Sequence, residues 1–111
     1  MIDIYICEDS DEQREIIRRY VKAAILIKEY DMKLKIATDD PEKIIEELKL
    51  SKNTGLYFLD IDLQAAKNGL TLAKEIREYD PRGFIVFVTS HSEMAFLTFQ
   101  YKVEALDFIL K

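Results

Sequence analysis

The chain has 111 residues, of which 49% are hydrophobic and 33% are charged. This composition fits one compact globular domain and excludes a disordered chain, which would lack the apolar side chains needed for a core. The formal net charge of −5 excludes a bare nucleic-acid-binding surface, because phosphate contacts need clustered Lys and Arg.

The first two predicted strands flank a long helix. Residues 2–7 are apolar and rich in β-branched side chains, which is typical of a strand. Ser10 and Gln13 then have the spacing of a capping box, and we expect the helix that begins there to run to about Tyr30. A second apolar run, 34–37, predicts the next strand.

Two further helices surround the third predicted strand. Asp40-Pro41 has the pattern of an N-cap followed by proline at the first helical position, and this helix is expected to end before Gly55. Residues 56–59 predict a strand. A third helix is expected after Gly69, and the turn sequence at 80–83 ends it.

The remaining sequence predicts a strand at 84–88, a helix from about Ser92 to about Lys102, and a strand at 105–110. Apolar strands that alternate with helices indicate a parallel sheet covered on both faces. We therefore expect an α/β domain with a doubly wound, five-stranded parallel sheet of flavodoxin-like order 2-1-3-4-5. In such a sheet the ligand site lies beyond the carboxyl ends of the strands.

Polar residues follow four of the five predicted strands. Glu8 and Asp9 come after the first strand, Asp60 after the third, Thr89 after the fourth and Lys111 after the fifth. These strands are contiguous in the expected order, so the side chains would meet in one cleft. Acidic residues are common in loops, and Glu8 with Asp9 alone would fit a solvated loop equally well. Asp60 interrupts an apolar run, where a charge is costly without partners.

This set of side chains suits Mg²⁺-dependent phosphoryl transfer. Clustered carboxylates repel one another unless a cation compensates, and Mg²⁺ prefers oxygen ligands. Asp60 could then attack phosphorus in line, because the metal would neutralise the phosphoryl oxygens. Lys111 would offer a second positive charge, and the Thr89 hydroxyl could donate to another phosphoryl oxygen.

The sequence resembles response-regulator receiver domains over the whole chain. The resemblance is carried by the acidic pair Glu8-Asp9 and by the segments YFLDID (57–62), GLTLAKEIR (69–77), IVFVTS (85–90) and ALDFILK (105–111). Within that family, YFLDID together with VTSHSEMAFLTFQYKVEALDFILK (88–111) is similar to the peptide quorum-sensing regulators of Gram-positive bacteria, of the accessory-gene-regulator and competence type. Such regulators carry a LytTR DNA-binding domain after the receiver.

The resemblance implies a role for each matching residue. Asp60 would be the phosphoacceptor, and Glu8 and Asp9 would be Mg²⁺ ligands together with the main-chain carbonyl of Asp62. The switch residues would be Thr89, Phe108 and Lys111. Taken alone, Thr89 and Phe108 would pass for an ordinary strand residue and an ordinary core residue.

The resemblance also implies partners. A sensor histidine kinase would phosphorylate the domain, and DNA would be bound only by a further C-terminal domain. Apolar residues at 94–97 and at Phe99 and Tyr101 leave the fourth predicted helix little polar face, which indicates that it is buried or meets a partner. We expect a homodimer contact on the face formed by this helix and the fifth strand.

Two departures from the family pattern affect these expectations. Glu8 stands where most receivers have Asp, and its extra methylene could alter the metal contact or make it water-mediated. The sequence also stops at Lys111, where the fifth helix of a receiver would follow, so residues 1–111 are read as a receiver domain truncated before that helix. We expect the truncation to uncover apolar surface beside the first helix and to weaken phosphoacceptor activity.

Three other functions compete with a phosphoacceptor. Asp60-Ile61-Asp62 matches the DxD of haloacid-dehalogenase-type phosphohydrolases, but there the motif follows the first strand and the chain is longer. A flavin or nucleotide binder is disfavoured because the sequence has only three glycines and no glycine-rich phosphate loop. An interaction domain that is never phosphorylated stays open. We expect a signalling domain and not an enzyme, with at most weak self-phosphorylation and autodephosphorylation.

Cys7 and the apolar runs bear on location. Cys7 is the only cysteine, so no internal disulfide can form, and a reducing cytoplasmic setting is expected. It is read as a small apolar residue of the first strand. Nowhere do about 18 uncharged apolar residues follow one another, and we expect no membrane segment.

Overall fold

A computed structural model gives the fold of the chain, and it describes residues 1–61, 68–89 and 107–110, with Thr89 and 107–110 described through their backbone. Eight elements alternate along these residues. They are β1 (Ile2–Cys7), α1 (Asp11–Lys28), β2 (Met32–Thr38), α2 (Pro41–Leu50), β3 (Thr54–Leu59), α3 (Gly69–Tyr79), β4 (Phe84–Thr89) and β5 (Asp107–Leu110).

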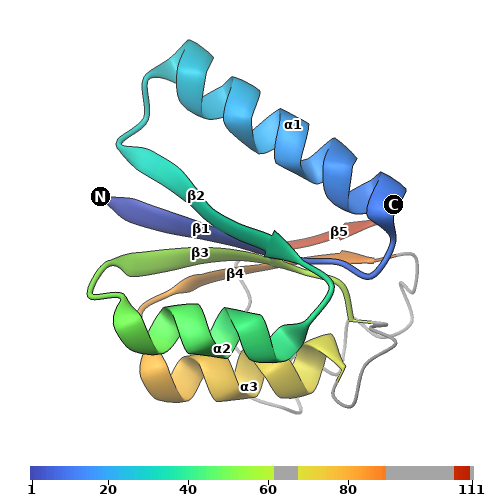
Figure 1. Ribbon diagram of the computed structural model, residues 1–111, viewed down its shortest axis with the longest axis vertical. Coiled ribbons are helices and arrows are strands. Elements are labelled where there is room, and N and C mark those ends of the chain that lie inside the picture. The colour runs from blue at the N-terminus through green and yellow to red at the C-terminus, as the bar shows by residue number, and fades with distance from the viewer. Residues whose placement is uncertain (62–67, 90–106, 111) are drawn as a thin grey trace.

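The strands form one parallel sheet of order β2-β1-β3-β4-β5. Figure 1 shows α1 on one face of the sheet and α2 and α3 side by side on the other. The expected α/β class, parallel sheet and flavodoxin-like order are thereby confirmed. The fourth predicted helix, from Ser92 to Lys102, lies outside the described residues.

Helices α1 and α2 begin at the predicted caps, Ser10 and Asp40. The Gln13 amide donates to Ser10 Oγ at 3.3 Å, and the Glu42 amide donates to Asp40 Oδ1 at 3.0 Å. At α3 the cap is Asn68, which accepts from the Thr71 amide at 2.9 Å. Each cap satisfies a donor that the first helical turn leaves without a partner, so each marks where the chain turns from strand end into helix.

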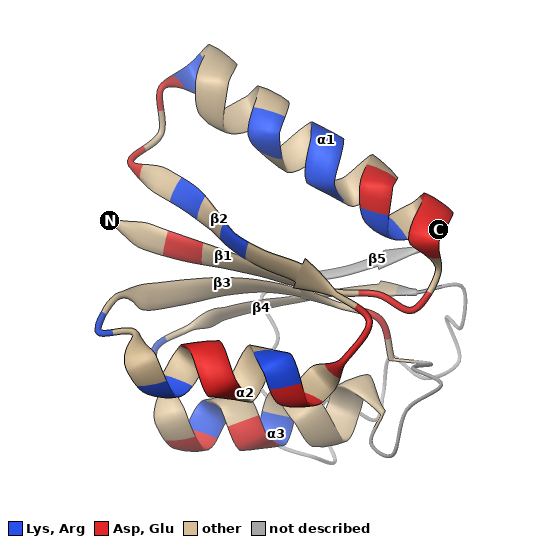
Figure 2. Cartoon of the chain, viewed as in Figure 1, with Lys and Arg blue, Asp and Glu red and all other residues tan. Residues whose placement is uncertain are grey.

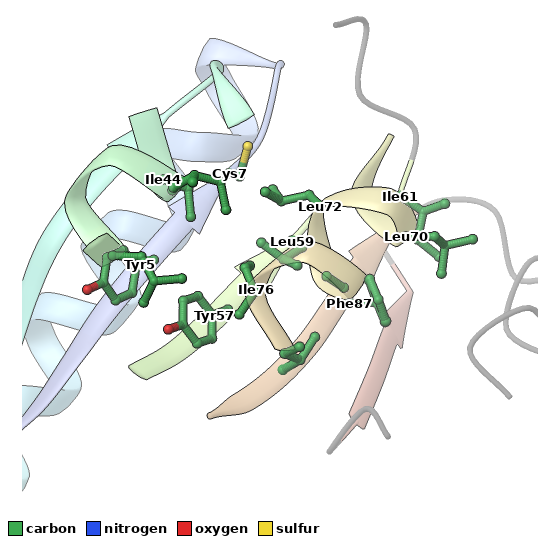
Figure 3. Packing of buried hydrophobic residues seen from close by; sticks show 14 residues of the cluster. Tyr5, Cys7, Ile44, Tyr57, Leu59, Ile61, Leu70, Leu72, Ile76 and Phe87 are labelled. Atoms are coloured by element: carbon green, nitrogen blue, oxygen red, sulfur yellow. The ribbon is translucent and has the colours of Figure 1, made fainter. Parts of the chain in front are cut away.

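The main core lies between the sheet and the α2/α3 layer. It contains alternate residues of the strands together with the inward faces of the two helices, and Figure 3 shows them interdigitating. Tyr5 and Tyr57 stack at one end of this core, with ring centroids 4.8 Å apart. Such a pair stabilises by about 0.5–1.5 kcal/mol beyond the area it buries. Since β1 and β3 are held rigidly by this core, their carboxyl ends are well placed to carry a site.

The α1 layer is less covered. Val21 is the one buried residue of α1 and is itself 9% exposed, while Ile17 and Ile25 are half-buried against Ile4 and Ile6 of β1. Large apolar side chains of α1 and of the turn after it are exposed: Ile16, Tyr20, Leu26, Ile27 and Tyr30. These side chains give α1 an exposed apolar surface. Among the described residues, no helix has both the length and the apolar character that crossing a membrane requires.

Candidate metal centre

Three carboxylates meet at the carboxyl edge of the sheet. Glu8 and Asp9 follow β1 and Asp60 follows β3, and each offers an oxygen that lies within 4.8 Å of the others. The two strands are neighbours, with Cys7 paired to Leu59 at their ends. Figure 2 shows the acidic segments that follow these strands on the same side of the sheet. The structure therefore brings together three of the predicted site residues.

Main-chain hydrogen bonds hold the carboxylates in place. The Glu8 amide donates to Thr38 O at 3.0 Å, and the Asp60 amide donates to Cys7 O at 3.0 Å. The strand pairing thus continues one residue past each strand end. In addition, the Ser10 amide donates to Glu8 Oε1 at 3.2 Å. The positions of these side chains are set by the sheet itself and by the start of α1.

Burial makes the negative charge of the cluster energetically unfavourable unless a cation is present. Glu8 is 1% exposed and Asp60 is 4% exposed, whereas Asp9 is half-buried. Carboxylates removed from water and placed beside one another are unfavourable unless cationic charge compensates them. Hard oxygen ligands from two strands, open to solvent on the Asp9 side, suit a divalent cation that keeps part of its water shell. The donor set therefore fits Mg²⁺.

The other predicted site residues are only partly described. Thr89 is the last residue of β4, and Phe108 lies in β5 opposite Phe87. Since β4 pairs with β3, Thr89 ends its strand at the same edge of the sheet as Asp60. Asp62 and Lys111 lie outside the described residues.

Two residues at the edge of the site were not predicted as part of it. Arg14 Nη1 donates to the main-chain oxygen of Glu8 at 2.8 Å. Gly69 begins α3 so close to β3 that a Cβ atom there would lie 2.1 Å from Asp60 O. The hydrogen bond from Arg14 and the close approach of Gly69 both involve the main-chain oxygen of a carboxylate residue, Glu8 or Asp60. In the sequence, their only signals are an arginine within the first helix and a glycine at a helix start.

Cys7, next to the site, has the structural role that the sequence predicted. Its side chain is fully buried in the main core. Burial, and to a smaller extent the neighbouring carboxylates, Asp39 first, together raise the pKa of the Cys7 thiol to about 12. A thiol held in its protonated form is a poor nucleophile and a poor metal ligand, so Cys7 is a packing residue.

Comparison with known proteins adds family relationships to this geometry. Residues 4–111 match the family model described as response regulator receiver domain. Over 108 residues the chain is 52% identical to accessory gene regulator protein A of Staphylococcus epidermidis, covering 97% of this chain and 45% of that protein. The chain thus spans about half the length of the curated relatives it matches.

Solved structures share the fold. The response regulatory domain of protein mrkE from Klebsiella pneumoniae matches with a TM-score of 0.81 and 28% identity, covering 98% of this chain and 82% of that one. Response regulator protein TrrA from Thermotoga maritima, in complex with Mg²⁺-BeF, matches with a TM-score of 0.77 and 20% identity, covering 100% of this chain and 87% of that one. TrrA has also been solved in complex with histidine kinase ThkA, and there the TM-score is 0.74 at 20% identity, with 100% and 86% covered.

Proposed function

Because the chain belongs to the response regulator receiver domain family, we propose that it accepts a phosphoryl group on Asp60 with the help of Mg²⁺. The observation that carries this proposal is the convergence of Glu8, Asp9 and Asp60 within 4.8 Å at the end of β1 and β3. The chain is a signalling domain, and apart from accepting the phosphoryl group from its donor it would carry out at most weak Mg²⁺-dependent self-phosphorylation and autodephosphorylation at that aspartate.

Glu8, Asp9 and Asp60 would hold the metal, with the main-chain carbonyl of Asp62 as a further ligand. The two buried carboxylates support this assignment, since they gain most from a cation. When bound, Mg²⁺ would neutralise part of the charge on the phosphoryl oxygens. The Mg²⁺-BeF complex of TrrA, whose fold the chain shares, is consistent with the same ion here.

Asp60 is the residue that forms the new bond. One of its carboxylate oxygens attacks phosphorus as the P–N bond of a phosphohistidine donor breaks, and the electron pair of that bond stays on the imidazole nitrogen. The amide of Asp60, tied to Cys7 O, keeps the attacking carboxylate at the end of β3 during the transfer. Positioning of this kind supplies much of the rate in phosphoryl transfer.

Three switch residues would respond to the acyl phosphate. Lys111 and Thr89 would stabilise it, and Phe108 would change position with Thr89. Lys111 would pair with a phosphoryl oxygen, and the Thr89 hydroxyl would donate to another. The position of Thr89 at the end of β4, next to the strand that carries Asp60, supports this role. Phe108 lies in β5 beside β4, so a shift of the threonine would reach it through one strand pair.

The donor would be a sensor histidine kinase, the kind of protein with which TrrA forms its complex. The output would be transcriptional, through a LytTR DNA-binding domain that follows the receiver in the full-length, cytoplasmic protein. The 45% coverage of accessory gene regulator protein A leaves room for such a domain. Phosphorylation would promote a homodimer through the fourth helix and β5, and the pathway would be peptide quorum sensing.

Beryllofluoride tests the proposed site, because it mimics a phosphoryl group on an aspartate. We expect beryllofluoride with Mg²⁺ to raise the melting temperature of the wild type and to leave that of Asp60→Asn unchanged. Asp62→Asn is the matched control, since a ligand contributed by the main chain survives that substitution. An equal rise in Asp60→Asn and the wild type would contradict the proposal, as would no rise in either.

A further inference from the structure

Arg14 connects the first helix to the acidic loop. Its Nη1 donates to the main-chain oxygen of Glu8 at 2.8 Å, while Nη2 pairs with the carboxylate of Asp11. The Arg14 side chain is 21% exposed, and its own amide donates to Ser10 O at 2.9 Å. The planar guanidinium can satisfy two acceptors at once, so it holds the loop from the helix side.

Glu8 is consequently held at three points. Its amide donates to Thr38 O, its carboxylate accepts from the Ser10 amide, and its carbonyl oxygen accepts from Arg14. That carbonyl belongs to the same planar peptide unit as the Asp9 amide. Holding the oxygen therefore sets the direction in which the chain enters Asp9, and with it the direction of the Asp9 side chain.

We propose that Arg14 is a positioning residue for the metal centre. By holding the Glu8 carbonyl, it keeps the Asp9 carboxylate within reach of Asp60. This inference rests on the proposed function, because it takes the three carboxylates to be metal ligands. Arg14 acts through Glu8 and Asp9, so its loss weakens metal binding while leaving the phosphoacceptor itself in place.

Arg18, one turn further along α1, offers a matched control. It pairs with the Glu15 side chain at 2.8 Å and 2.9 Å. These side chains are 37% and 40% exposed and the ion pair joins two residues of the same helix, so it adds little to the position of the loop. Arg14→Gln and Arg18→Gln remove the same charge from the same helix, but only the first breaks a hydrogen bond to Glu8.

The first measurement is Mg²⁺ affinity by calorimetry. We expect Arg14→Gln to weaken Mg²⁺ binding by about tenfold, as loss of a residue that orients a metal ligand commonly does. The Mg²⁺ affinity of Arg14→Lys should lie between those of Arg14→Gln and the wild type, because an ammonium can reach one acceptor but cannot bind two in the way that a planar guanidinium does. Arg18→Gln should bind Mg²⁺ as the wild type does. Labelling by acetyl phosphate should need more Mg²⁺ in Arg14→Gln and reach the wild-type rate at saturation.

The second measurement is amide hydrogen exchange in the metal-free protein. Loss of the hydrogen bond from Arg14 to Glu8 O should speed amide exchange at Asp9 and Ser10 in Arg14→Gln. Exchange at the same amides should be unchanged in Arg18→Gln, which keeps that bond. Wild-type Mg²⁺ affinity in Arg14→Gln, or unchanged exchange at Asp9, would overturn the positioning role. If the wild type itself bound no Mg²⁺, the proposed function would fail, and exchange at Asp9 would then decide alone whether Arg14 holds this loop.

Discussion

The main-chain oxygen of Asp60 lies 2.1 Å from the point that a Cβ atom on Gly69 would occupy. The amide of Gly69 donates to Ile61 O at 2.9 Å, so the first turn of α3 rests directly against the end of β3. A residue without a side chain is required for this approach. The helix start and the proposed phosphoacceptor are therefore mechanically coupled.

Gly69→Ala should destabilise the protein and disturb the site together. Alanine favours a helix over glycine by roughly 0.5–1 kcal/mol, but forcing a methyl group into backbone costs about 1–3 kcal/mol, so the clash should win. We expect a lower midpoint in urea denaturation and weaker Mg²⁺ binding. Lys74→Ala, on the exposed side of the same helix, should change neither. Unchanged stability and Mg²⁺ affinity in Gly69→Ala would contradict this prediction, because they would show that the backbone at Asp60 moves to accept the methyl group at no cost.

Asp9→Asn should stabilise the metal-free protein while weakening its response to Mg²⁺. Three carboxylates with oxygens within 4.8 Å of one another repel, and removing one charge relieves Coulomb repulsion of order 1 kcal/mol. The melting temperature without metal should therefore rise, and the increase caused by Mg²⁺ should shrink. Glu46→Gln, which removes an exposed charge on α2, serves as control. A metal-free melting temperature that falls in Asp9→Asn would argue against carboxylate repulsion at this edge.

Tyr57 and Tyr5 should respond differently to loss of their hydroxyl groups. Tyr57 donates to Asp80 Oδ2 at 2.8 Å, so Tyr57→Phe should lower the free energy of unfolding by about 1 kcal/mol. The buried Tyr5 hydroxyl has no hydrogen-bond partner among the described residues, and nearby Ser51 donates to Asp3 instead. Tyr5→Phe should thus be neutral or stabilising. Equal losses in urea denaturation of the two variants would contradict this difference.

The Cys7 thiol should make stability fall at alkaline pH. Burial raises its pKa from 9.0 to about 12 in the folded state, so the folded protein binds this proton more tightly than the unfolded chain does. The contribution is complete below the unfolded pKa and is lost as pH rises through the window from 9.0 to about 12.

The test compares the wild type with Cys7→Ala across that window. Burial also raises the pKa of Tyr57 and of Tyr5, which act in the same direction in both proteins. The stability difference between the two proteins should therefore narrow as the thiol ionises in the unfolded state. A constant difference, or rapid reaction of the native thiol with a disulfide reagent at neutral pH, would mean that the thiol is not held protonated.

Periodicity and capping residues predicted most of the described fold. The caps at Ser10 and Asp40 are predictable from residue type because their side chains accept hydrogen bonds from main-chain amides of the helix that follows. Element ends were less accurate where tertiary structure decides them. Strand β2 begins at Met32 and not at residue 34, because Met32 pairs with Ile2 although Lys33 interrupts the apolar run. Helix α1 ends at Lys28 because Glu29 adopts a left-handed conformation.

The carboxylate cluster was predictable for a topological reason. Parallel strands end at one edge, so residues that follow adjacent strands must meet there, whatever their separation in sequence. The contributions of Arg14 and Gly69 were not predictable in the same way. Both depend on where a main-chain oxygen points, at Glu8 and at Asp60, and residue type does not encode that direction.

The most direct test of the phosphoacceptor is to locate the phosphoryl group itself. The protein would be incubated with acetyl phosphate and Mg²⁺, and the acyl phosphate would be mapped by mass spectrometry of its peptides. We predict a single, slowly formed modification on Asp60 that does not form when Mg²⁺ is chelated beforehand and is absent from Asp60→Asn. Modification of a different residue, undiminished labelling of Asp60→Asn, or no labelling at any Mg²⁺ concentration would contradict it.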